Sequence, residues 1–280
     1  MAITYNDLFL DIRRELKRGG IIDTTLEARE LTCFGVNKTK EELTRDGRLY
    51  APPELERRVR ELTARHLAGE PVAYLIGEWE FYGLPLEISN EVLVPRMDTE
   101  LLAERAVRAL QDFGPGAHAL DLCCGSGCLG ITLALEVPSA QVDMADLSED
   151  ALAVTRKNAE RLGAQVSLLR GDLWDAVDAR QYQLIVSNPP YIPDADCLAL
   201  QAEVMREPPM ALKGGTDGFD FYRRIAAGLR KHLLPGGVLL LEVGFDQAER
   251  VAELLRAAGC ETACHEDYQH ILRMVEARWA

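Results

Sequence analysis

The sequence predicts an α/β protein: a doubly wound, mostly parallel sheet with a C-terminal antiparallel hairpin, preceded by a small helical domain. Residues 1–78 carry apolar side chains at helical spacing. From about residue 98, strand-like and helix-like segments alternate, which is typical of a parallel sheet covered by helices on both faces. Near the end, 262–265 and 272–277 are strand-like with no helix between them, which favours an antiparallel hairpin at one end of the sheet.

The expected helical domain spans residues 1–78. In its first helix Ile3, Leu8, Ile12 and Leu16 share one face, and Gly19-Gly20 ends it. Thr24-Thr25 precedes a second helix over 26–34, and Pro52-Pro53 opens a third over 54–67. This part carries no cluster of catalytic residue types, so we interpret it as a substrate-recognition or packing domain.

Residues 79–97 are expected to form a β-hairpin that links the two domains. Apolar residues alternate with others from Trp79 to Ile88, Ser89-Asn90 gives a turn, and Val92 to Pro95 would pair back.

The expected sheet domain spans residues 98–280. Thr99 could cap a helix that runs to Leu110. The expected strands are 117–122, 141–147, 166–170, 183–187, 237–243, 262–265 and 272–277, and the expected helices are 128–135, 149–162, 217–233 and 247–258.

Composition excludes several classes of protein. The apolar runs are too short to span a bilayer and the N-terminus does not resemble a secretory signal, so a cytoplasmic protein is expected. The net charge of −14 would repel phosphate backbones, which argues against direct binding of nucleic acid. The seven cysteines are scattered and odd in number, so neither a disulfide framework nor a metal site at Cys123, Cys124 and Cys128 is expected.

A glycine-rich loop follows the first strand of the sheet domain and reads Asp-Leu-Cys-Cys-Gly-Ser-Gly-Cys-Leu-Gly from Asp121. Cys123, Cys124, Gly125, Ser126 and Gly127 would let the backbone approach a ligand at the start of the next helix. The glycines at 125, 127 and 130 also match the dinucleotide fingerprint, so taken alone they leave NAD and S-adenosylmethionine open.

Three carboxylates lie after the expected strands. Asp121 at a strand end suits the cationic amine of S-adenosylmethionine and disfavours a pyrophosphate, because like charges repel. Asp146 could accept hydrogen bonds from two ribose hydroxyls, and Asp172 could meet an adenine amino group; each could instead cap the helix that follows it. With the next motif, these residues favour S-adenosylmethionine.

The fourth strand leads directly into Asn188, Pro189, Pro190 and Tyr191. An amide or aromatic amino nitrogen is planar and a poor nucleophile. The Asn188 side-chain oxygen and the Pro189 carbonyl could hold its two hydrogens and favour pyramidalisation as the methyl group arrives. The prolines restrict the backbone and Tyr191 offers an aromatic face. The alternative is a polar turn, because Asn-Pro often starts one.

These motifs, in this order, resemble the class I amino methyltransferases with the Asn-Pro-Pro-Tyr motif, whose sheet has seven strands. Further segments resemble the peptide chain release factor glutamine methyltransferases (PrmC/HemK) over nearly the whole chain. They are Gly69 to Leu75, Phe81 to Leu84, Val94 to Glu100, Glu207 to Leu212 and Gly215 to Gly218. The resemblance implies N5-methylation of the glutamine in the Gly-Gly-Gln motif of class I release factors, with S-adenosylmethionine as cofactor.

Carried over by position, the resemblance assigns Cys123 to Gly127 to the cofactor loop and Asp146 to the ribose. Asn188 to Tyr191 would grip the glutamine amide, and Arg96 and Phe81 would border the substrate channel. It implies release factors as partners, no direct contact with nucleic acid or membrane, and a monomer. The alternatives are a ribosomal-protein glutamine methyltransferase (PrmB), which the cysteine in the loop favours, an adenine-N6 methyltransferase, a dinucleotide oxidoreductase, or a binding module without catalysis.

Overall fold

The computed structural model describes residues 2–279 as two compact units. The helical unit comprises the residues up to 78 together with 201–206, and the sheet unit comprises 79–200 and 207–279. The sequence places residues 201–206 in the sheet domain, whereas in the structure they pack with the helices. No helix within the described residues is both long and apolar enough to cross a membrane.

The helical unit packs around apolar faces that the sequence spacing predicts. Its elements are α1 (Tyr5–Arg18), α2 (Thr24–Val36), α3 (Lys40–Arg45), α4 (Pro53–Leu67), α5 (Val72–Ile76) and η3 (Val204–Arg206). Leu8, Ile12 and Leu16 of α1 are fully buried. A Cβ on Gly35 of α2 would lie 2.4 Å from Cγ2 of Val59, so this glycine lets α2 and α4 approach closely.

Residues 201–206 meet the helices at the buried His66. Its Nδ1 lies 2.9 Å from the Glu70 carbonyl and its Nε2 lies 3.1 Å from a Glu27 oxygen and 3.9 Å from a Glu203 oxygen. Burial opposes protonation of the imidazole, but the bonds to Glu27 and the Glu70 carbonyl and the two nearby carboxylates outweigh it and raise the pKa of His66. An ion pair of the imidazolium with both carboxylates accounts for this cluster.

The sheet unit contains a two-stranded hairpin and a seven-stranded sheet of order β5-β4-β3-β6-β7-β9-β8. Its strands are β1 (Glu78–Phe81), β2 (Leu84–Glu87), β3 (His118–Leu122), β4 (Gln141–Asp146), β5 (Val166–Arg170), β6 (Tyr182–Ser187), β7 (Leu233–Glu242), β8 (Cys260–Glu266) and β9 (Leu272–Trp279). Neighbours from β5 to β7 pair in parallel, while β9 pairs antiparallel with β7 and β8. The predicted fold class, with its terminal hairpin, is confirmed.

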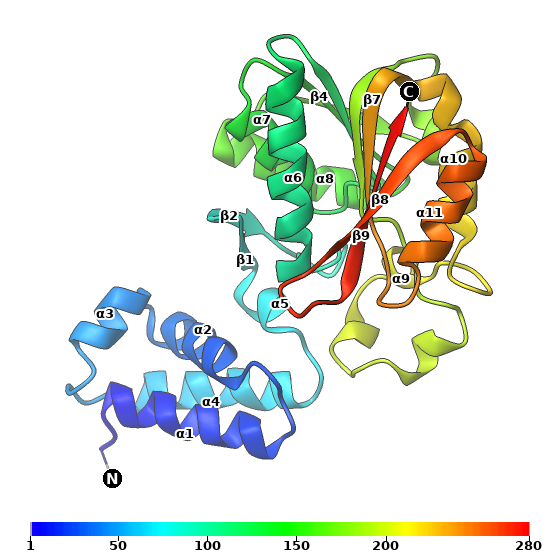
Figure 1. The fold of residues 1–280 in the computed structure, drawn as a ribbon. Helices are drawn as coiled ribbons and strands as arrows, with labels where there is room; N and C mark the ends of the chain where they lie inside the picture. The colour runs from blue at the N-terminus through cyan, green and yellow to red at the C-terminus, as the bar shows by residue number, and fades with distance from the viewer. Residues whose placement is uncertain (1, 280) are drawn as a thin grey trace. The chain divides into compact units, whose positions relative to one another are not determined.

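Helices cover both faces of this sheet, with α6, α7 and α8 on one side and α10 and α11 on the other (Figure 1). The helical elements are α6 (Met97–Phe113), α7 (Cys128–Glu136), α8 (Glu149–Leu162), η1 (Leu173–Ala176), η2 (Asp196–Ala199), α9 (Pro209–Leu212), α10 (Asp220–His232) and α11 (Ala248–Ala257). One face of the sheet packs on α10 and α11 through a continuous apolar core that includes Ile185, Leu239 and Val251. Burial on both faces explains why the central strands are apolar runs.

Two local expectations differ from the structure. The hairpin turns at Tyr82-Gly83, both at positive φ, instead of at Ser89-Asn90, and residues 92–95 are not a strand. The continuous alternation from 79 to 88 hides this turn, because Tyr82 is not a residue type that marks positive φ. Thr99 is not the cap of α6: that helix begins at Met97, so Thr99 lies in its first turn with its side chain free for another partner.

Candidate active site

The sheet brings the two sequence motifs to the same edge. β3 lies between β4 and β6, and Leu122 pairs with Ser187, so Cys123 and Asn188 leave adjacent parallel strands in the same direction. The connections reverse between β3 and β6, and the carboxyl ends of strands at such a switch point form a crevice. A cavity of about 270 Å³ opens there, lined entirely by residues of the sheet unit.

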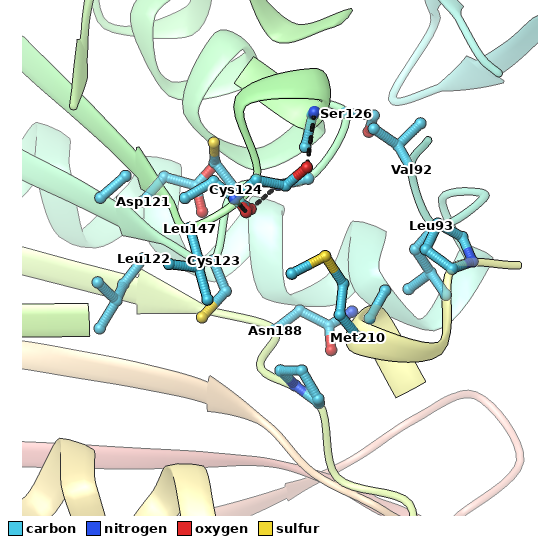
Figure 2. A pocket seen from close by; sticks show the side chains of 18 of the residues that line it. Val92, Leu93, Asp121, Leu122, Cys123, Cys124, Ser126, Leu147, Asn188 and Met210 are labelled. Atoms are coloured by element: carbon cyan, nitrogen blue, oxygen red, sulfur yellow. Dashed lines mark hydrogen bonds between the residues drawn. The ribbon is translucent and has the colours of Figure 1, made fainter. Parts of the chain in front are cut away.

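The glycine loop forms one wall of this cavity (Figure 2). Close packing requires glycine at positions 127 and 130. A Cβ on Gly127 would lie 2.8 Å from Cγ2 of Thr155, and a Cβ on Gly130 would lie 2.7 Å from Cγ of Met144. Gly125, at φ +53°, has no atom within 4 Å of that position and lines the cavity. Gly127 is therefore structural, whereas Gly125 leaves room for a ligand beside the backbone.

Three cysteines of this loop line the cavity: Cys123, Cys124 and Cys128. Burial raises the pKa of all three thiols, which favours their neutral form. The loop thus presents uncharged sulfur on this wall, which suits an apolar or aromatic group better than a metal ion.

Asp121 is the buried carboxylate at the end of β3, with 1% of its surface exposed. One oxygen accepts the Gly130 N–H at 2.8 Å, while Oδ1 is buried without a partner. Burial raises the pKa of Asp121 to about 7; the Gly130 bond opposes the shift and the Asp146 charge adds to it. An orphaned carboxylate oxygen beside a cavity lacks a donor, and a cationic amine would supply one.

Asp146 and Asp172 also line the cavity. The two oxygens of Asp146 accept the N–H groups of Gly125 and Ser148, each at 2.9 Å, so this side chain ties β4 to the glycine loop. Each oxygen keeps a second lone pair that could accept a hydroxyl. Asp172 makes no side-chain cap to η1 and instead pairs with Arg224 at 2.7 Å.

Asn188 also lines the cavity, just after the end of β6, the strand that neighbours β3 (Figure 2). Its Nδ2 makes a long hydrogen bond of 3.4 Å to the Thr99 hydroxyl, which in turn donates to Glu242 at 2.6 Å. Burial raises the pKa of Glu242 to about 7, against the effect of the Thr99 bond. The sequence predicts Thr99 only as a helix cap and does not single out Glu242, because each lies far along the chain from the Asn-Pro-Pro-Tyr motif.

The backbone of the motif is fixed by glycines that follow it. A Cβ on Gly214 would lie 2.7 Å from the Tyr191 Cα, and one on Gly218 would lie 2.4 Å from the Tyr191 carbonyl oxygen. That oxygen accepts from Gln247 Nε2 at 2.9 Å. Pro190 lines the cavity; Pro189 and Tyr191 do not, and Tyr191 packs against the apolar core instead.

The sequence patterns do not reveal part of the wall. The cavity is also lined by Val92, Leu93, Met210, Lys213, Phe221 and Arg224. In Figure 2 the strand-end residues Asp121 to Cys124 lie on one side of the view and Val92 and Leu93 on the other. Val92 and Leu93 belong to the segment expected as a strand, and their spacing gives no sign that they close a cavity.

Arg96 and Phe81 do not line the cavity. Arg96 pairs with the buried Glu207, whose other oxygen accepts the Val94 N–H at 2.9 Å. This contact fastens residues 94–96 to the start of α9, whose Met210 does line the cavity. Phe81 is 1% exposed, at the end of β1.

Comparison with known proteins adds independent information. A model of the methyltransferase small domain matches residues 97–218, and one of the PrmC N-terminal domain matches residues 7–77. The chain is 43% identical over 228 residues to the release factor glutamine methyltransferase of Geobacter sulfurreducens, covering 81% of this chain and 79% of that protein. It is 45% identical over 236 residues to the protein of that name from Bordetella pertussis, covering 84% and 87%. A methyltransferase structure from Pyrococcus furiosus has a TM-score of 0.54 at 19% identity, covers 78% of this chain and 98% of its own, and shows the fold alone.

Proposed function

Because the chain belongs to the family of release factor glutamine methyltransferases, we propose that it transfers a methyl group from S-adenosylmethionine to a release factor. The acceptor is the side-chain amide nitrogen, N5, of the glutamine in the Gly-Gly-Gln motif of class I release factors. One observation carries the proposal: a single cavity is lined by the glycine loop with an orphaned Asp121 oxygen and by Asn188.

The residues of the loop wall fit S-adenosylmethionine. Asp121 Oδ1 would accept from its cationic amine, Asp146 from its ribose hydroxyls, and the open side of Gly125 leaves space for the ligand. Asp172 is proposed at the adenine end, where its pairing with Arg224 holds it at the cavity wall. When bound, S-adenosylmethionine supplies an electrophilic methyl group on a sulfonium.

The residues of the Asn188 wall fit a planar amide. Its NH2 group has two donors and a delocalised lone pair, so it needs two fixed acceptors to become nucleophilic. Asn188 Oδ1 has no hydrogen-bond partner among the described residues, and we assign it and the Pro189 carbonyl to this role. Most of the rate would come from holding the nitrogen in line for transfer. No general base is needed, because the nitrogen becomes acidic once methylated and then loses a proton.

We also propose that the partner is a protein and that the chain binds no nucleic acid directly. The net charge of −14 supports this, because a phosphate backbone would be repelled. The enzyme would act as a monomer in the cytoplasm.

The experiment is incubation of the purified chain with S-adenosylmethionine and an intact class I release factor, followed by mass spectrometry of tryptic peptides. We expect the Gly-Gly-Gln peptide to gain the mass of one CH2 group on the glutamine. Methylation of a ribosomal protein with none on the release factor would transfer the proposal to that substrate. Binding of NAD in place of S-adenosylmethionine, measured by calorimetric titration, would overturn it.

A further inference from the structure

Asn188 is the cavity end of a chain of three polar side chains that runs into the interior. Asn188 Nδ2 bonds to Thr99 Oγ1 at 3.4 Å, and Thr99 Oγ1 bonds to Glu242 Oε2 at 2.6 Å. Thr99 is 1% exposed and Glu242 is 4% exposed. The three residues come from the end of β6, the first turn of α6 and the end of β7.

The chemistry of these three side chains fixes which group donates and which accepts in each of the two hydrogen bonds. An ionised carboxylate can only accept, so the Thr99 hydroxyl must give its one hydrogen to Glu242. The Thr99 oxygen can then only accept from Asn188, and the NH2 group is the end of that amide which donates. The amide oxygen is therefore turned away from Thr99. If the Asn188 amide were reversed, its NH2 group would face the NH2 group of the substrate amide. Both groups are hydrogen-bond donors, so they could not bond to each other.

We infer that Thr99 and Glu242 are positioning residues, which hold the Asn188 amide with its oxygen toward the nitrogen to be methylated. The inference rests on the proposed function for the identity of that nitrogen. Glu242 acts through Thr99 and Asn188, because it is buried and does not line the cavity. Thr99 lines the cavity, but its one hydroxyl hydrogen is held by Glu242. Thr99 thus links the buried Glu242 carboxylate to the Asn188 amide through two hydrogen bonds.

The protonation of Glu242 then matters for turnover. Burial raises its pKa to about 7, the Thr99 bond and the Arg273 and Arg96 charges lower it, and Asp98 raises it. Tyr191, Tyr222 and Cys128 also face this carboxylate. Protonated Glu242 can donate to Thr99, which frees the Thr99 hydrogen for the oxygen of Asn188 and favours the reversed amide. Turnover should therefore rise with pH through about 7.

The test compares Thr99→Val, Thr99→Ser and the native chain, with release factor and saturating S-adenosylmethionine. Valine has nearly the shape of threonine without its hydroxyl, and serine keeps the hydroxyl. We expect Thr99→Val to lower kcat by about tenfold to a hundredfold with KM nearly unchanged, and Thr99→Ser to retain most activity. Thr63→Val is the matched control: that buried hydroxyl bonds only to the Val59 carbonyl of its own helix, so kcat should stay native.

Glu242→Gln separates positioning from packing, because it keeps the volume and removes the titration. We expect a kcat that no longer changes with pH near 7, because the glutamine amide oxygen still accepts from Thr99 but does not titrate. A native kcat and pH profile in both Thr99→Val and Glu242→Gln would overturn the inference. A loss in Thr99→Val that Thr99→Ser shares would show packing alone and overturn it too.

A crystal structure of the native chain and of Thr99→Val gives a readout that does not depend on turnover. We expect the Asn188 amide to rotate in the variant and to keep its Thr99 bond in the native chain. An unchanged Asn188 in Thr99→Val would overturn positioning, whatever the substrate. Absence of methylation by the native chain would instead count against the proposed function alone.

Discussion

The two walls of the cavity are built in different ways. The loop wall comes mainly from one stretch of chain, Asp121 to Cys128, whose shape depends on glycines and on backbone N–H groups held by Asp121 and Asp146. The second wall depends on one side chain, Asn188, whose neighbours Thr99 and Glu242 lie far away in sequence. The fold itself fixes the position of backbone groups, whereas the orientation of one side-chain amide must be held by a network of hydrogen bonds.

The difference suggests that the walls can be disabled separately. Asn188→Ala removes the proposed acceptor oxygen and leaves the loop intact. We expect kcat to fall by about a hundredfold to a thousandfold, as for loss of a transition-state hydrogen bond. The affinity for S-adenosylmethionine, measured by calorimetry, should remain near the native value. A kcat close to native would remove Asn188 from the reaction.

Asp121→Asn should have the complementary effect. It keeps the shape of the side chain and removes the charge proposed to pair with the cationic amine. We expect the Kd for S-adenosylmethionine to rise by about tenfold to a hundredfold, the range for a hydrogen bond to a charged group. Asp112→Asn, on the exposed end of α6, is the control and should bind normally. Equal affinities in the two variants would contradict the assignment of Asp121.

Asp121 in the loop wall and Glu242 behind Thr99 are both buried carboxyl groups, and burial raises the pKa of each to about 7. As pH rises from about 4 to 7, the unfolded chain loses these protons before the folded chain does, so each group makes folding less favourable over that window. Relative to native, Asp121→Asn and Glu242→Gln should gain stability over it, on the order of 1 to 3 kcal/mol each. Urea unfolding at pH 5 and pH 8 measures this, and a pH-independent difference would refute it.

The same contrast explains how much the sequence can predict. The sheet elements follow from apolar runs bounded by turn residues, and β5 is predicted with its observed ends. The loop wall is nearly contiguous in sequence, so strand and turn patterns alone bring Asp121, Gly125 and Asp146 to one edge of the sheet. Thr99 looks like a helix cap in the sequence, because spacing alone does not reveal that its hydroxyl faces a carboxylate 143 residues later.

Other differences from the sequence prediction also come from individual contacts. The apolar spacing of the sequence does not predict the short helix α3. This helix begins at a capping box formed by Thr39 and Glu42. Residues 201–206 belong to the helical unit, where Glu203 lies 3.9 Å from a histidine on α4. Such contacts depend on tertiary packing, and no period in the sequence encodes them.

The most direct test of the account is mass spectrometry of an intact class I release factor after reaction with the native chain and with Asn188→Ala. The account predicts one added CH2 group on the Gly-Gly-Gln glutamine with the native chain and almost none with the variant at equal time. A methyl group on another residue, or equal methylation by both proteins, would contradict it.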